Sequence, residues 1–212
     1  MNQRITVGVI ALVALCAGIV GALYIAPPST SKPAYFQAYP TPRDINSFSL
    51  TSHTDSAFTQ ENLKGHWSLV FLGYTYCPDI CPTTMAELNG IFPSLQEIYT
   101  EHSPQVVFVS VDPKRDTTER LAQYIGFFND SFVAVTGEHA QLFPLARNLG
   151  MMYSMSDSTD NPNYLVDHSA SVVVVNPQAQ VVGRFKPHRQ PGQLAISDAQ
   201  QILHDMPILM SD

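Results

Sequence analysis

Two cysteines separated by three residues are the part of this sequence best suited to chemistry. Cys77 and Cys81 lie in the segment Gly73–Met85, which reads GYTYCPDICPTTM. Thiolates are both nucleophiles and soft metal ligands, and this spacing puts the two sulfurs about one helical turn apart. Such a pair can form a disulfide or hold one soft metal ion. The spacing alone does not choose between these two uses.

Other uses of the pair fit less well. A structural zinc site needs four protein ligands, and no histidine pair at metal-binding spacing accompanies these two cysteines. A site that resembles a peroxiredoxin-type thiol peroxidase would have a Thr three positions before its Cys, whereas this chain has Tyr74 at that position. Two core-filling cysteines are disfavoured because both lie in one proline-flanked loop.

Alternating strand and helix patterns surround the cysteines. The apolar run Ser68–Tyr74 predicts a buried strand, and apolar spacing over Met85–Tyr99 predicts a helix after it. A second unit follows, with a strand at Val106–Val111 and a helix at Thr117–Phe128 capped by Asp116 or Thr117. Further on we expect a strand at Phe132–Val135, a helix at His139–Leu149 ending at Gly150, strands at Ser171–Val175 and Val181–Phe185 flanking a turn, and a last helix at Gly192–His204.

Parallel units followed by an antiparallel hairpin and a closing helix indicate an α/β protein, a thioredoxin-like three-layer sandwich. Open α/β sheets bind ligands at the carboxyl ends of their strands, where the loop with Cys77 and Cys81 lies. A cysteine at the start of a helix has its thiolate stabilised by the helix dipole. We therefore expect thiols of low pKa at this edge of the sheet.

The N-terminus indicates a membrane anchor. Ile5–Ala26 is a run of 22 residues without a charge, and a spanning helix needs about 20 apolar residues, whereas a signal peptide has a shorter apolar region. Cleavage after a Val20 and Ala22 pair is the alternative. The expected organisation is a cytoplasmic tail at 1–4, a transmembrane anchor at 5–26, a proline-rich spacer at 27–46, the folded domain at 47–206 and a C-terminal tail at 207–212.

The charge and the N-terminal sequence narrow the possible partners and the cellular location. The formal net charge of −7, with no basic stripe, excludes nucleic acid as a partner because phosphates need clustered Lys and Arg. The start has no Arg- and Ser-rich transit peptide, and the tail before the anchor is only a few residues long. We expect a single-pass protein of a bacterial inner membrane, with its C-terminal domain in the periplasm.

Three stretches resemble the Sco/SenC family, the membrane-anchored copper chaperones of cytochrome c oxidase assembly. They are Phe58–Met85, Val109–Thr117 and Tyr164–Phe185, in the same order and spacing as in the family. The resemblance extends over roughly residues 45–205, and its most specific elements are the CPxxCP loop and the later Asp-His-Ser. Two positions depart from the family pattern: Tyr76 stands where His is common, and Asn176 where Asp is common.

The resemblance implies a copper site formed by Cys77, Cys81 and His168. Two thiolates and an imidazole suit Cu(I) and tolerate Cu(II), whereas hard cations prefer oxygen ligands. Two acidic residues are weighed beside this set. Asp167 is either a turn residue or an orienting partner of the imidazole, and Asp112 either begins a turn or opens into the crevice beside the cysteines.

Other soft or basic side chains are interpreted as structural. Met151, Met152 and Met155 are expected to fill apolar gaps rather than to bind copper. The six histidines other than His168 are scattered without the spacing of a second metal site: His53, His66, His102, His139, His188 and His204.

The function that the resemblance implies is that of a copper metallochaperone for the dinuclear copper site of cytochrome c oxidase subunit II, or for another copper acceptor. A periplasmic copper donor or thiol reductant would be its other partner, and the protein would not be an enzyme. The alternative is a membrane-tethered thiol-disulfide oxidoreductase using Cys77 and Cys81, in which His168 is dispensable. A copper or redox sensor would share every one of these residues.

Overall fold

The computed structural model describes residues 3–25, 32–98, 101–155, 158–188, 191–192 and 194–211. The chain divides into two compact units, Met1–Lys32 and Pro33–Asp212. Residues 1–2 of the expected cytoplasmic tail and residues 26–31, at the boundary of the expected anchor and spacer, lie outside the described residues.

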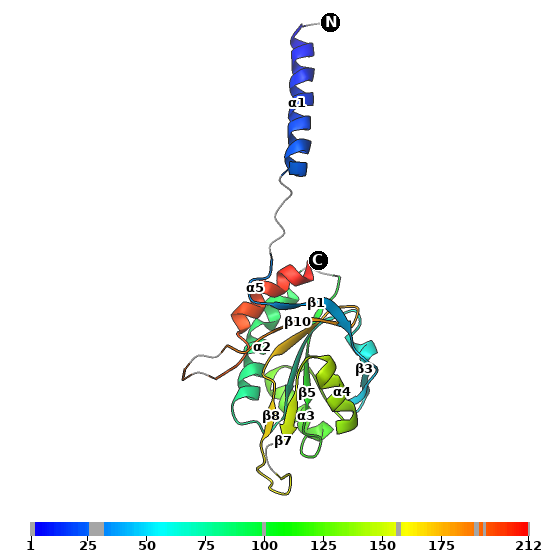
Figure 1. Cartoon of the computed structure of the whole chain (residues 1–212), viewed down its shortest axis with the longest axis vertical. Helices are drawn as coiled ribbons and strands as arrows, with labels where there is room; N and C mark the ends of the chain where they lie inside the picture. The colour runs from blue at the N-terminus through cyan, green and yellow to red at the C-terminus, as the bar shows by residue number, and fades with distance from the viewer. Residues whose placement is uncertain are drawn as a thin grey trace. The chain divides into compact units, whose positions relative to one another are not determined.

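The first unit contains the helix α1 (Gln3–Ile25). Over Gln3–Gly21 its mean hydropathy is 2.2, and it has the length and composition of a helix that crosses a membrane. Cys16 is exposed on this helix. The apolar N-terminal helix predicted from the sequence is therefore present (Figure 1).

The second unit is built on one eight-stranded sheet. Its centre is β4 (Trp67–Gly73), β5 (Pro104–Ser110) and β6 (Val133–Thr136), which run parallel. Parallel strands joined by helical crossovers are buried on both faces, and all of Ser68–Gly73 is accordingly buried. The full order is β1-β10-β9-β4-β5-β6-β2-β3, where the other strands are β1 (Gln37–Asp44), β2 (Ser49–Ser52), β3 (Ala57–Thr59), β9 (Val172–Val175) and β10 (Gln180–Phe185).

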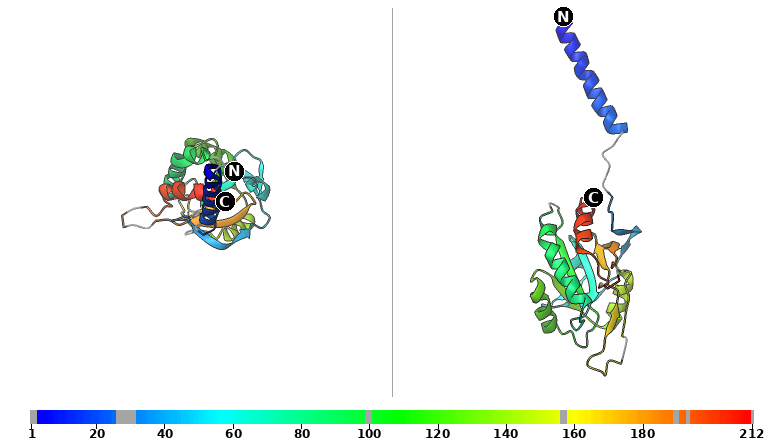
Figure 2. Two further views of the ribbon diagram at one scale, coloured as in Figure 1. Left: turned by 90° about the horizontal axis from the view of Figure 1, so that it is seen from above. Right: turned by 90° about the vertical axis from the view of Figure 1, so that its left-hand side faces the viewer.

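Helices cover both faces of this sheet. The elements are a short 3₁₀ helix η1 (Gln60–Leu63) and the α-helices α2 (Ile80–Gln96), α3 (Thr118–Phe128), α4 (His139–Asn148) and α5 (Ala199–Met210). Helix α2 packs against α3 and α5, and α4 lies on the other side of the strands (Figure 2). The predicted three-layer α/β sandwich is confirmed.

The predicted spacer is wrong over residues 37–44, which form β1. This strand pairs antiparallel with β10 alone, at the edge of the sheet, and its register shifts between Ala38 and Arg43. Pro40 and Pro42 lie in the shifted part, where a residue without an N–H is tolerated because an edge strand has one unpaired side. Proline content alone therefore misread an edge strand as a linker.

The last helix is also placed differently from the prediction. It begins at Ala199, because the Asp198 side chain accepts hydrogen bonds from the N–H groups of Gln200 and Gln201. It continues to Met210, whose side chain is buried, so the expected tail at 207–212 is helical as far as Met210. Strands β1, β2 and β3 and the two-stranded sheet described below were not predicted; all but β1 are only three or four residues long.

Candidate metal centre

The cysteine loop leaves the carboxyl end of β4 and is fixed by a buried carboxylate. Asp116 accepts hydrogen bonds from the N–H of Thr75 at 2.9 Å, from the Thr75 hydroxyl at 2.7 Å and from the Ser110 hydroxyl at 2.5 Å. Burial raises the pKa of Asp116, while these hydrogen bonds oppose the rise. From the sequence, Asp116 was proposed only as a helix cap. In the structure its carboxylate holds the cysteine loop against β5.

The two cysteines occupy different environments in this loop. Cys77 is half-buried, and its N–H donates to the carbonyl of Tyr74 at 3.2 Å. Cys81 is buried in the first turn of α2, and its N–H donates to the Cys77 sulfur at 3.4 Å. The helix thus begins five residues earlier than predicted, which puts the Cys77 sulfur at the N-terminus of α2.

His168 reaches the cysteines from a separate hairpin. It ends β8 (Val166–His168), which pairs antiparallel with β7 (Tyr153–Met155), and lies opposite Tyr153 in the register. Its ring packs edge-on against Phe71 and Tyr74, with centroid distances of 5.8 and 5.9 Å. The hairpin and the aromatic rings of β4 and the loop after it together set the direction of the imidazole.

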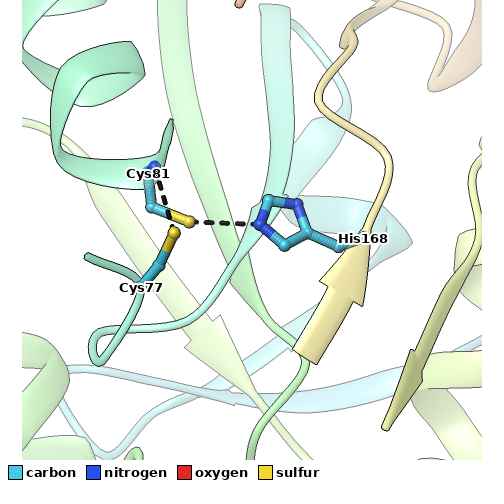
Figure 3. A group of neighbouring side chains, drawn as sticks. All are labelled: Cys77, Cys81 and His168. Atoms are coloured by element: carbon cyan, nitrogen blue, oxygen red, sulfur yellow. Dashed lines mark hydrogen bonds between the residues drawn. The ribbon is translucent and has the colours of Figure 1, made fainter. Parts of the chain in front are cut away.

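The ligand atoms of Cys77, Cys81 and His168 all lie within 4.8 Å of one another (Figure 3). The Cys81 sulfur is 3.3 Å from Nε2 of His168, and Nδ1 of the same ring is 3.3 Å from the carbonyl oxygen of Ser169. A carbonyl can only accept, so the tautomer with its proton on Nδ1 makes this contact a hydrogen bond and leaves the Nε2 lone pair free for a metal ion. The histidine is therefore oriented as a metal ligand requires.

The pKa values of the two thiols are shifted in opposite directions in the metal-free protein. A hydrogen bond from the Cys81 side chain lowers the pKa of Cys77 to about 4, and a hydrogen bond with His168 contributes in the same direction, against the effect of burial. Burial raises the pKa of Cys81, as does the neighbouring Cys77 thiolate. At neutral pH the pair therefore carries one thiolate, on the more accessible sulfur.

Gly73 leaves the space into which Cys81 fits. A Cβ at this position would lie 2.8 Å from the Cys81 sulfur and 2.6 Å from a ring carbon of Phe108. No other residue type could occupy the last position of β4 without moving one of these groups. The glycine before the cysteine loop is therefore part of the site's geometry.

The remaining candidates lie outside this group of three. Asp112 is buried, and both of its oxygens accept hydrogen bonds, one from the Tyr164 hydroxyl and one from Nε of Arg115. It borders a cleft that contains neither cysteine, and its carbonyl accepts from the N–H groups of Arg115 and Asp116, so of the two alternatives the structure favours the start of a turn. Asp167 is exposed on β8 and borders the same cleft as His168, and its orienting role remains a prediction.

The three methionines do not gather around a common point of the site. Met151 is buried in the core and Met155 is partly buried against it, as gap-filling side chains are. Met152, in contrast, is 75% exposed and borders the cleft beside His168. Within the part of the chain that the structure describes, Cys77, Cys81 and His168 form the one cluster of three potential metal ligands.

The donor set fits a soft or borderline metal ion. It consists of two sulfurs and one imidazole nitrogen and includes no carboxylate oxygen. Thiolate and imidazole favour copper or zinc, whereas Mg²⁺ and Ca²⁺ prefer oxygen. Fold and site together define a thioredoxin-like protein with a dithiol and a histidine at the edge of its sheet.

Comparison with known proteins agrees with this class. The SCO1/SenC family model matches residues 37–204, and the chain belongs to this family. An SCO2-like protein of Rickettsia prowazekii is 33% identical over 191 residues, which cover 87% of this chain and 91% of the relative. The mitochondrial SCO1 homolog of Homo sapiens is 31% identical over 152 residues, 72% of this chain, which thus spans about half (50%) of the human protein's length.

Two solved structures extend the comparison to three dimensions. The copper-bound ScoI of Arabidopsis thaliana has a TM-score of 0.66 and 26% identity, and the match covers 79% of this chain and 98% of that one. The copper-bound yeast Sco1 has a TM-score of 0.64 at 25% identity, over 78% of this chain and 89% of the yeast chain. Both structures share the fold described above.

Proposed function

We propose that this protein binds copper through Cys77, Cys81 and His168 and delivers it during the assembly of cytochrome c oxidase. The observation that carries the proposal is the approach of His168 to the cysteine pair, with its Nε2 3.3 Å from the Cys81 sulfur. A dithiol alone needs no histidine, whereas a three-ligand site for copper does. The copper-bound relatives of the same fold support the choice of metal.

Delivery by ligand exchange follows from the unequal burial of the ligands. Cys81 is buried, whereas Cys77 is half-buried at the surface of the site. An incoming thiolate of an acceptor can therefore add to the metal on the Cys77 side before a ligand of this chain leaves. We propose that one copper ion is carried per chain, as Cu(I) or Cu(II), and that its acceptor is the dinuclear copper site of oxidase subunit II.

The anchor fits a protein that works at a membrane. Helix α1 would hold the folded domain at a bacterial inner membrane, with residues after the helix in the periplasm. Residues 5–26 would be the anchor, 27–32 the spacer, and 33–210 the folded domain. A copper donor or a thiol reductant of the same compartment would reload the site.

The experiment compares copper transfer by the full chain and by His168→Ala. The copper-loaded protein is mixed with a purified soluble domain of subunit II, and copper in the acceptor is followed by its absorption. We expect one copper per chain and efficient transfer by the wild type, and both to be lost in His168→Ala. Undiminished transfer by His168→Ala would contradict the proposal.

A second candidate is a thiol-disulfide oxidoreductase. It is favoured by the low pKa of Cys77 and by the burial of Cys81 next to it, the pattern of an attacking and a resolving thiol. In this case His168→Ala would still reduce the disulfide of an acceptor, and Cys77→Ser would not. The two variants together separate copper delivery from disulfide reduction.

A further inference from the structure

Two separate clefts border the metal centre. The His168 cleft, of about 600 Å³, is bordered by Met152, Asp167, His168 and Pro187. The Cys77 cleft, of about 390 Å³, is bordered by Cys77, Pro82, Arg120, Tyr124, Phe127 and Phe128. Of the three proposed ligands, only Cys77 lies in the second cleft, and it is the accessible thiol of the pair.

Arg120 supplies a cation to the Cys77 cleft. Its Nε donates to the Thr75 hydroxyl at 3.1 Å, and its guanidinium lies 5.0 Å from the centre of the Tyr76 ring. Among the described residues no carboxylate lies within ion-pair distance of it, and its two terminal nitrogens make no hydrogen bond. The two terminal guanidinium nitrogens of Arg120 are thus available to bind a carboxylate beside the Cys77 thiol.

Aromatic side chains form another part of the cleft wall. Phe127 is 85% exposed, which is the highest value among the large apolar side chains that the structure describes. A large aromatic ring in water costs free energy, and an occupant that covers Phe127 would remove that cost.

These features together specify the occupant. We infer that the Cys77 cleft docks a cysteine-bearing segment of the partner protein in which an acidic residue neighbours the cysteine. This inference rests on the proposed function in one respect, namely that the cysteine of the partner approaches the site on the Cys77 side. The carboxylate would pair with Arg120, the apolar part of the segment would cover Phe127, and the cysteine would lie next to the Cys77 sulfur. The cleft's volume fits a few side chains rather than a whole helix.

The docking can be measured without copper by a thiol exchange reaction. The probes are two short peptides, identical except that the single cysteine is flanked by Asp in one and by Asn in the other. Each cysteine carries a 4-thiopyridyl disulfide. The Cys77 thiolate attacks the peptide sulfur, the bond between that sulfur and the pyridyl sulfur breaks, and thiopyridone leaves, taking up a proton. The new bond joins Cys77 to the peptide, so no other oxidant or reductant is needed.

The initial release of thiopyridone is followed by absorbance, using the metal-free full chain in neutral detergent with Cys16→Ser to remove the thiol of α1. We expect the Asp peptide to react about tenfold faster than the Asn peptide at low ionic strength, and this preference to fall as salt is added. Arg120→Gln should remove the preference. Lys186→Gln, which removes an exposed cation outside both clefts, should leave it unchanged.

A second pair of variants tests the apolar part of the cleft. Phe127→Ala should slow both peptides several-fold, whereas Met152→Ala, which shortens an exposed apolar side chain in the His168 cleft, should not. Alkylation by iodoacetamide, a small neutral reagent, measures the intrinsic reactivity of Cys77 and serves to normalise every rate.

Three outcomes would overturn the inference. They are equal rates for the two peptides with the unsubstituted chain, a preference that survives Arg120→Gln, and slowing by Met152→Ala but not by Phe127→Ala. The last of these would move the docking surface to the His168 cleft. None of them involves copper, so failure here is distinguishable from failure of the copper proposal.

Discussion

Two buried groups in this domain join distant parts of the chain, and they differ in what their polar atoms do. Asp205, fully buried in α5, accepts hydrogen bonds from the N–H groups of Ala34, Tyr35 and Phe36 at 2.6–2.9 Å. The imidazole of His204 also lies 2.8 Å from one of its oxygens. Both oxygens are thereby satisfied, and the start of the second unit is fastened to its last helix.

The donors of the metal centre contact mainly one another. The Cys77 sulfur accepts from the Cys81 N–H, and the Cys81 sulfur faces Nε2 of His168. Sulfur is a weak hydrogen-bond acceptor. These contacts therefore satisfy the two cysteine sulfurs less fully than the backbone N–H groups satisfy the oxygens of Asp205. A polar group fully satisfied by the backbone holds the structure together, whereas converging soft donors are available to a ligand. Substitutions in the two places should therefore have opposite signatures.

The largest expected effect is on copper affinity. Cys81→Ser should weaken Cu(I) binding by more than about 100-fold, because it replaces a soft sulfur ligand with a hard oxygen. Loss of a residue that only contacts a ligand lowers metal affinity by up to about 100-fold, and loss of a ligand itself should cost more. Cys16→Ser, which changes a thiol of α1, is the control and should leave affinity unchanged. Competition with a chromophoric Cu(I) chelator measures both. Equal affinities for the two variants would remove Cys81 from the site.

Asp205→Asn should show the reverse signature. An Asn amide must direct its NH₂ group at one of the backbone N–H donors, so we expect a loss of about 2–3 kcal/mol in the free energy of unfolding. Copper affinity should remain unchanged. Asp44→Asn, at the exposed edge, should change stability by less than about 0.5 kcal/mol. Urea unfolding provides the values, and a copper defect in Asp205→Asn would contradict the separation of the two groups.

Gly73→Ala should affect both properties, because one methyl group would press on Phe108 and on the Cys81 sulfur. We expect a destabilisation of about 1–2 kcal/mol, within the usual cost of overpacking, together with weaker copper binding. Gly90→Ala in α2 is the matched control, since a Cβ there meets open space and an alanine favours the helix by about 0.5–1 kcal/mol. Identical behaviour of the two variants would show that Gly73 does not shape the site.

The smallest effect concerns acid stability. Hydrogen bonds from His204 and the three N–H groups lower the pKa of Asp205, although burial alone would raise it. A carboxyl group whose pKa is lower in the folded than in the unfolded state stabilises the fold above its unfolded pKa, and this contribution is lost as pH falls through the folded value. The stability difference between wild type and Asp205→Asn should therefore shrink on acidification below about pH 4. A constant difference would show that Asp205 contributes nothing through its charge.

The sequence predicts the two regions unequally well. The strand before the cysteine pair and the helix after it were both predicted, because hydrophobic periodicity is a local signal and both are long elements. The start of the helix was placed too late, since α2 begins at Ile80 and includes Cys81. His168 came from family resemblance alone, since β8 has three residues and its approach to the cysteines depends on pairing with β7. No period-based rule could have shown that contact.

Asp205 and Arg120 were not singled out from the sequence at all. An acidic residue on an amphipathic helix resembles an exposed one, and the partners of Asp205 are backbone groups that leave no trace in side-chain patterns. Likewise, the position of Arg120 beside Cys77 depends on how α3 packs against the cysteine loop. Tertiary contacts of this kind become visible only when the whole fold is known.

The most direct test of the central claim is X-ray absorption spectroscopy at the copper edge, on the full chain in detergent loaded with Cu(I). The account predicts one copper per chain with two sulfur ligands and one nitrogen ligand, and loss of the nitrogen in His168→Ala. A spectrum with two sulfurs and the same nitrogen contribution in wild type and His168→Ala would contradict it.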